Sequence, residues 1–510
     1  MSFKEVKELR KSGKIDDALV LAQQDLEIEP ENIWNKRSIA WVYYEYLKKY
    51  ASPENYNQFK GYLEKLNSLS LPDDENMVFD NCAYQIGKII FALQNEQQVE
   101  FSKLNEIFNI IKDFSFTKPS ESYTFVYKAF HKGYLNWSNY LSFANWWNFD
   151  NFHSQDCLTE EYKGKTIMSL VEKAYIAYSK KILEGEKEFV ETELGPLSRG
   201  KVIKQDQIND FLPKLDMLIG NHPEYQYPPY YQAKLLLAIG EKESVLKSFI
   251  PFAKKKKSDF WVWELMADVF PEDDERKIAC LCKALSLKTP EDFLIKTREK
   301  LAYLLIAKGF NNEAKTEITK VFLVRKEKGW KFPEGLQAQL NNPNIKSAEA
   351  YIDNAVFYKK YIKTAEEILY HDVPEEIIAV EFVNTNKKML NFIIDEKKNG
   401  YFKYAGFVEN PKIGDVLKVR FVENVNDGYN QVFTIKRVLD KIEIPAIKEF
   451  KGNIKILETS NIGFVDNVFI SSQLLSHNNI SQDIEVKGKA ILSFNKKKEE
   501  WGWKAYEINQ

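Results

Sequence analysis

Residues 453–470 read NIKILETSNIGFVDNVFI and contain the clearest structural signal in the chain. Apolar and polar residues alternate in Asn453–Leu457, Gly463–Val465 and Val468–Ile470, and the alternation returns at 489–492. Short alternating runs separated by Asn, Asp, Ser and Gly are typical of strands in a small antiparallel sheet. The last sixty or so residues are therefore expected to form a β-domain.

Aromatic and basic residues gather in this β-domain. Phe464 and Phe469 fall on neighbouring predicted strands that are joined by a turn at Asp466-Asn467. Aromatic side chains on a sheet face, with lysines around them, form a platform on which unpaired bases stack. Core packing is the alternative for the phenylalanines, because aromatic residues are common in small cores. The predicted nucleic-acid-binding residues are Phe464, Phe469, Trp501, Trp503, Lys455, Lys496, Lys497 and Lys498.

The same stretch resembles a known family. Asn461–Val465 followed by Val468–Ile470 is similar to the paired RNA-binding motifs of cold-shock and S1-like OB-fold domains, which have the forms K-G-F-G-F-I and V-F-V-H-F. In this resemblance Phe464 and Phe469 match two stacking aromatics. The sequence departs from the motifs at Ile462, where the family has an aromatic, and at 471–472, where two serines replace its His and Phe. The resemblance implies an OB-fold with a reduced stacking face.

A second β-region precedes this one. After Val373-Pro374 the pattern changes to five alternating runs, which are punctuated by Gly and Pro and lie at 377–383, 390–394, 401–407, 416–422 and 432–438. Five short strands over this length is typical of an OB-like barrel. The sequence therefore predicts a first OB-like β-barrel at 374–444 and a second, S1/cold-shock-like barrel at 446–510, with Pro445 between them.

The part before residue 373 has helical patterns. The run LRKSGKIDDA at 9–18, followed by EPEN at 29–32, has the form of a tetratricopeptide repeat, and LAYLLIAKGFNNEA at 301–314 keeps its spacing. Small residues let the two helices of a hairpin approach closely, and Pro ends the second helix. We expect a tetratricopeptide-like α-helical solenoid in two regions, 1–195 and 196–372, with a protein partner on its concave face. An ordinary helical bundle is the alternative.

Composition limits the function classes. The formal net charge of −2 provides no general attraction to nucleic acid, so any binding must come from a local patch. Four scattered cysteines do not make a disulfide framework, which fits a reducing compartment. No apolar run approaches the ~18 residues of a membrane span, and the N-terminus is charged where a secretion signal would be apolar. A cytoplasmic protein without membrane association is expected.

No catalytic motif stands out. The sequence has no phosphate-binding loop, Gly-rich dinucleotide turn, G-x-S-x-G or H-E-x-x-H, so no catalytic residue, metal or cofactor is predicted. Cys280 and Cys282 point apart on a predicted helix and are interpreted as buried thiols. A cryptic hydrolase using His153 with Cys157 or Asp156, beside the aromatic segment at 143–152, is the least favoured hypothesis.

Two further segments have competing interpretations. The aromatic segment at 143–152 could line a groove, but a packed core is favoured. The basic run at 254–257 could touch nucleic acid, but a solvated helix end is favoured.

The overall order resembles the tetratricopeptide and OB-fold components of bacterial TOTE conflict systems, which are predicted to act in defence against mobile elements. Gly463–Val465, Val468–Ile470, Trp501–Ala505 and Trp146-Trp147 carry this resemblance. It implies a non-catalytic adaptor that works beside nuclease, helicase or primase-type partners. The expected function is binding of single-stranded RNA or DNA, with RNA favoured, through the OB-folds, and of an unidentified protein through the solenoid. A protein–protein scaffold with purely structural barrels is the alternative.

Overall fold

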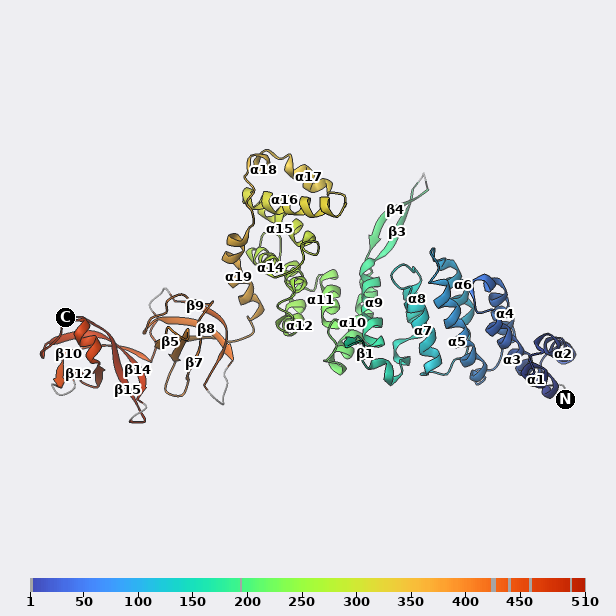
Figure 1. Ribbon diagram of the computed structural model, residues 1–510, viewed down its shortest axis with the longest axis horizontal. Coiled ribbons are helices and arrows are strands. Elements are labelled where there is room, and N and C mark those ends of the chain that lie inside the picture. Colours follow the sequence, from blue (N-terminus) through green and yellow to red (C-terminus); the bar gives the residue numbers. More distant parts are fainter. Residues whose placement is uncertain are drawn as a thin grey trace. The chain divides into compact units, whose positions relative to one another are not determined.

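The structure is a computed structural model that describes residues 3–192, 195–422, 428–438, 442–457, 461–495 and 498–509. The chain divides into two compact units, Met1–Phe249 and Ile250–Gln510. Helices come first and the larger β-sheets follow (Figure 1), which confirms the expected order of α before β. Within the described residues, no helix combines the length and apolar character needed to cross a bilayer.

The first unit is mainly helical. Its helices are α1 Phe3–Lys11, α2 Ile15–Ile28, α3 Ile33–Lys49, η1 Pro53–Asn55, α4 Tyr56–Ser68, α5 Asn76–Leu93, α6 Phe101–Ile111, α7 Glu121–His131, α8 Tyr140–Trp147, η2 Phe149–Asn151, η3 Ser154–Cys157, α9 Leu170–Glu184, α10 Gln205–Asn221 and α11 Pro228–Ala238. Helix α12 Lys242–Lys255 crosses into the second unit.

Two small hairpins interrupt the helices of the first unit. They are β1 Glu160–Tyr162 with β2 Lys165–Ile167, and β3 Glu186–Thr192 with β4 Gly195–Val202. The expected boundary between residues 195 and 196 falls within the second hairpin, where the sequence predicted only a break between helices. The domain limits inside the helical region stay a prediction.

Both predicted helical hairpins form. Gly13 lies between α1 and α2 with φ +81°, a conformation that glycine adopts readily, and Ala18 and Ala22 are buried where the helices pack. Gly309, with φ +79°, has the same place between α15 Ile295–Ala307 and α16 Asn311–Glu327. The buried alanines therefore pack as predicted, whereas the two glycines serve the turn, because a Cβ at either would meet nothing within 4 Å. The tetratricopeptide identity of the hairpins stays a prediction.

The aromatic segment is core. Phe143 and Trp147 are fully buried, and the Trp147 ring stacks on Tyr123 at a centroid distance of 4.9 Å. Trp146 is partly buried against the same cluster and donates from Nε1–H to the Lys112 carbonyl. The packed-core interpretation is therefore confirmed.

The helices of the second unit lead directly to its sheets. They are α13 Phe260–Val269, α14 Glu275–Ser286, α15, α16, α17 Glu334–Leu340, α18 Pro343–Ser347 and α19 Ala355–Leu369. A buried polar network ties three of them together, because Arg298 on α15 and Tyr358 on α19 both bond the fully buried Glu317 carboxylate of α16. Cys280 and Cys282 are buried in α14, as expected.

The first β-region has five strands, as predicted. They are β5 Glu375–Asn384, β6 Met389–Ile393, β7 Asn399–Lys403, β8 Val416–Val422 and β9 Gln431–Arg437, in the sheet order β7-β6-β5-β8-β9. A parallel bridge between Tyr401 and Tyr429 brings the two edges of this sheet together. Its core contains Leu390, Phe392 and Phe402.

The second β-region has six strands and one short helix. They are β10 Ile447–Asn453, β11 Lys455–Leu457, β12 Ile462–Val465, β13 Val468–Ile470, α20 Ser472–His477, β14 Glu485–Asn495 and β15 Glu500–Asn509. The sheet order is β10-β14-β15-β13-β12-β11. Strands β10 and β11 lie at the two ends of this order, yet only Ile454 separates them in the chain. The sheet therefore closes on itself.

The strand expected at 453–457 is interrupted at Ile454, so that Asn453 ends β10 and Lys455 begins β11. The Ile454 side chain is fully buried and its N–H donates to the Ile484 carbonyl, so the chain leaves β14 and continues beside β12. Gly463 of β12 faces this break, and a Cβ there would lie 2.7 Å from Ile454 Cδ1. The absent side chain at Gly463 thus lets the strand turn.

Candidate nucleic-acid interface

Phe464 and Phe469 form a cross-strand pair on the outside of the second β-region. They lie directly opposite each other on β12 and β13, with ring centroids 5.6 Å apart and planes at 61°. Their strand neighbours Val465, Val468 and Ile470 point into the core, so alternation turns both rings outward, where they are partly exposed. The structure therefore brings together the two aromatics that matched the family motifs.

Two lysines extend this pair into a row. Lys455 on β11 is opposite Phe464, and Lys504 on β15 is the parallel-strand neighbour of Phe469. Both lysines are exposed, and neither has an ion-pair partner within the described part of the chain. We call Lys455, Phe464, Phe469 and Lys504 the second-barrel row. It can offer stacking surfaces with a cation on each side.

Lys504 was not predicted from the sequence. It lies 35 positions after Phe469 and reaches it only through the parallel pairing of β13 with β15. Sequence spacing predicts neighbours within a hairpin but not this long-range pairing. The only local signal was the alternation of Trp503 and Ala505, whose side chains face the other way.

Trp503 lies on the core side of the sheet. It is partly buried against the core cluster, and the Lys448 ammonium lies 4.5 Å from its ring centroid. Lys448 also donates to Asn467 Oδ1 at 2.7 Å, and its burial lowers the pKa of its ammonium. Trp503 and Lys448 therefore belong to one structural contact, and Trp503 does not join the Phe464–Phe469 face.

Trp501 packs where the two β-regions meet. It belongs to an apolar cluster that contains Ala379 and Ile393 from the first region and Ile491 from the second. Ser493 also donates a 2.7 Å hydrogen bond to Glu381 across this contact. Burial in the contact raises the pKa of Tyr506 to about 12. Trp501 therefore packs in the contact between the two β-regions and does not join the second-barrel row.

The predicted cluster of three lysines is only partly described. Lys496 and Lys497 lie outside the described residues. Lys498 is exposed and forms a 3.5 Å ion pair with Glu500. None of the three therefore adds to the geometry of the row.

The basic run at 254–257 lies at the end of α12, where Lys255 and Lys257 are exposed, and two of its lysines also contact the residues that follow α19. Lys254 Nζ bonds both carboxylate oxygens of Asp372, at 2.7 and 2.8 Å, and Lys257 donates to the Tyr370 hydroxyl. Tyr370 in turn stacks on Phe433 of β9 with centroids 4.2 Å apart. The run joins the helices of the second unit to the first β-region.

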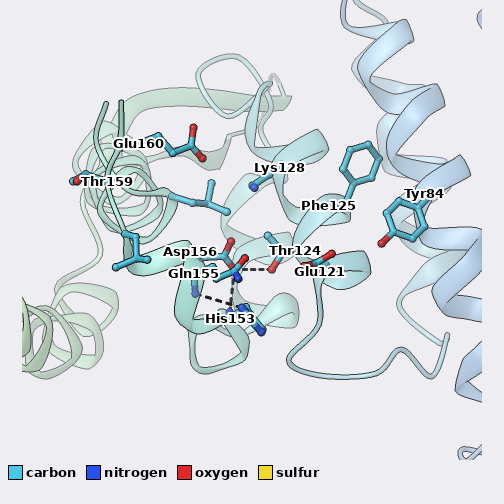
Figure 2. A pocket seen from close by; sticks show the side chains of 12 residues that line it. Tyr84, Glu121, Thr124, Phe125, Lys128, His153, Gln155, Asp156, Thr159 and Glu160 are labelled. Carbon is cyan, nitrogen blue, oxygen red and sulfur yellow. Dashed lines mark hydrogen bonds between the residues drawn. The ribbon is translucent and has the colours of Figure 1, made fainter. Parts of the chain in front are cut away.

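The first unit contains a cleft of about 560 Å³ near the residues of the hydrolase hypothesis. Figure 2 shows His153, Asp156 and Thr124 in this cleft. The buried Asp156 carboxylate accepts from the His153 N–H at 2.9 Å and from the Thr124 hydroxyl at 2.7 Å. The His153–Asp156 bond and a second bond, from the Gln155 N–H to His153 Nδ1, form a capping box for η3, so His153 and Asp156 have a structural role.

Cys157 has no sign of activation. Burial raises the pKa of its thiol, which disfavours the thiolate needed for nucleophilic attack. Within the described residues, no group of three metal-binding side chains is found.

Three family models match the second unit and the end of the first. A domain of unknown function, DUF7017, matches residues 226–365. S1/CSD-like domain 1 of the TOTE conflict systems matches 370–432, and S1/CSD-like domain 2 of these systems matches 448–508. Two S1/CSD-like domains of the TOTE conflict systems are therefore present at the C-terminus, and they coincide with the two β-regions. No curated protein matches the chain.

Proposed function

We propose that the protein is a non-catalytic adaptor of a bacterial conflict system that binds single-stranded nucleic acid, RNA in preference to DNA, through the second-barrel row. The observation that carries this proposal is the outward pair Phe464–Phe469 between Lys455 and Lys504. Its location in an S1/CSD-like domain supports nucleic acid as the ligand.

We infer that both β-regions are OB-folds. In the first region β5 pairs with β6 and β8, and Tyr401 of β7 forms a parallel bridge to Tyr429, just before β9. In the second region β10 and β11 together take the place of the first strand and pair with β14 and β12, and β13 is parallel to β15. OB-folds bind oligonucleotides on the face of strands two and three. Here those strands are β12 and β13, which carry the two phenylalanines.

The row suits a ligand with bases and phosphates. A base stacked on an aromatic ring contributes about 1–3 kcal/mol, and this contribution depends little on the sequence of the strand. Lys455 and Lys504 are free to neutralise phosphates, which compensates locally for the net charge of −2.

The helical part would hold a protein partner. Hairpins α1–α2 and α15–α16 have the small-residue contacts of tetratricopeptide repeats, and stacked repeats of that kind form extended binding surfaces. The four cysteines are free thiols, which suits a cytoplasmic location.

A scaffold without nucleic acid is the second candidate, and one observation favours it. Ser471, at the position of the family's histidine, accepts from the Leu474 N–H and caps α20. The end of the second motif therefore has a structural task here, and the stacking face is smaller than in the family.

Fluorescence anisotropy of labelled single-stranded RNA and DNA with the full-length protein tests the proposal. The wild-type affinity should fall steeply with salt, because bound phosphates release counterions. Phe464→Ala and Phe469→Ala should each cost about 1–3 kcal/mol of binding free energy. Trp330→Ala, which removes an exposed aromatic from the segment that follows α16, is the matched control.

Unchanged affinity in both phenylalanine variants would favour the scaffold. Equal affinity for RNA and DNA would remove the RNA preference and leave the rest of the proposal in place.

A further inference from the structure

The first β-region carries an outward row in the same place as the second-barrel row. Phe382 of β5 is opposite Asn391 of β6, and Asn391 is opposite Tyr401 of β7. Their neighbours Leu390, Phe392 and Phe402 fill the core, so these three side chains face outward. We call Phe382, Asn391 and Tyr401 the first-barrel row.

A bulge puts Phe382 in this row. The register of β5 shifts between Val380 and Phe382, because Glu381 is an extra residue opposite β6. Val380 points into the core, and without the bulge Phe382 would point there too. Instead the Phe382 side chain is 49% exposed.

The first-barrel row has the chemistry of a nucleic-acid contact. Phe382 and Tyr401 can stack bases, and within the described residues the Asn391 amide has no hydrogen-bond partner, so it can donate to and accept from a base edge. Lys403 is exposed on the same face of β7, two residues from Tyr401, where it can meet a phosphate.

The two rows reach the same seam between the barrels. In the second barrel, the neighbour of Lys504 on β14 is Ile491, which is about two strand spacings, or ~10 Å, from Phe469. In the first barrel, Ile393 lies two residues, or ~7 Å, along β6 from Asn391. Ile491 and Ile393 pack in one apolar cluster, so both outer faces end at the same seam.

We infer that one single strand of nucleic acid crosses both barrels, with bases on Phe464 and Phe469 at one end, on Phe382, Asn391 and Tyr401 at the other, and Lys504 between them at the seam. This inference rests on the proposed function of the second-barrel row. Such a track makes the binding site longer than that of one barrel, and the second contact is held beside the first by the packed seam.

Anisotropy titrations of single-stranded RNA of increasing length, with the full-length protein, test the track. One OB-fold covers about 4–16 nucleotides, so lengths should begin near the lower limit and rise to about twice the upper one. The double variant Phe382→Ala with Tyr401→Ala should lose about tenfold or more in affinity for long strands and keep the wild-type affinity for the shortest. Phe382 is exposed and Tyr401 is partly exposed, and Asn391→Ala is a milder second variant with the same expected length dependence.

The outcomes separate the two ideas. Loss in the Phe464 and Phe469 variants at every length, with no loss in the first-barrel variants at any length, would overturn the track and keep the proposed function. Equal loss at all lengths in the first-barrel variants would also overturn it, because the first barrel would then be an independent site. No loss of affinity in the Phe464 and Phe469 variants would reject the proposed function itself. Photocrosslinking of a long strand labelled at either end should mark Tyr401 peptides from one end and Phe464 peptides from the other.

Discussion

The two barrels pair their strands in the same order but bend the first strand in different ways. In the second barrel the strand breaks at Ile454, and the side chains of 450, 454 and 456 stay on the core side across the break. In the first barrel β5 is continuous and bends at the Glu381 bulge, after which the alternation is reversed. The comparison teaches that the way the first strand bends, by a break or by a bulge, decides which aromatics face outward as much as the residue pattern does.

The largest expected effect concerns closure of the second barrel. At Gly488 a Cβ would lie 2.2 Å from the Glu507 carbonyl oxygen, so Gly488→Ala must push β14 and β15 apart. The variant should destabilise the barrel by about 3 kcal/mol, the upper part of the usual range for overpacking. Hydrogen exchange of the β14 and β15 amides in the full-length protein measures this.

Gly502→Ala is the matched control for this prediction. Gly502 lies on β15 of the same barrel, and a Cβ there would meet nothing within 4 Å. The first barrel should keep its exchange rates in both variants. Equal exchange in the Gly488 and Gly502 variants would contradict the importance of close packing for closure.

A smaller effect is expected at the seam. Trp501→Ala removes a partly buried ring from the cluster shared by the two barrels, so it should cost about 2 kcal/mol, roughly half the value for a fully buried tryptophan. Exchange should rise on both sides of the seam, in β5 and β14. Affinity for the shortest RNA should stay near that of the wild type, and a loss there as large as in Phe464→Ala would return Trp501 to the stacking site.

The smallest effects concern charge. Lys504→Ala should lower the slope of log affinity against log salt by about 0.7, the value for one phosphate contact on a single strand. Lys254→Ala should leave that slope unchanged, because Lys254 is paired with Asp372 beside the first barrel. A slope that changes equally in both variants would mean that the basic run at 254–257 also meets the nucleic acid.

Much of the second-barrel face follows from the sequence alone. Alternation is regular within β12 and within β13, and the two-residue turn at Asp466-Asn467 joins them, so Phe464 and Phe469 could be assigned to the same face of the sheet. The count of five strands in the first barrel and the glycine-centred hairpins at Gly13 and Gly309 were equally local signals.

The rest depends on contacts that no local pattern contains. Phe382 faces outward only because of a bulge, and Lys504 reaches Phe469 only through parallel pairing. Trp501 and Lys254 have the residue types of a nucleic-acid site, but tertiary packing gives them other neighbours. Residue type and charge in the sequence therefore predict which side chains can bind nucleic acid, and the fold decides which of them remain free to do so.

Helix α19 connects two of the contacts described above. Near one end Tyr358 is fixed to α15 and α16 by the buried Glu317 network, and at the other Tyr370 is stacked on Phe433 of the first barrel, roughly 18 Å away along the helix. The chain between Tyr358 and Tyr370 is the helix α19 itself, with Tyr370 as its C-cap. Because α19 holds both contacts, we expect a partner that displaces α15 and α16 to displace the first barrel as well.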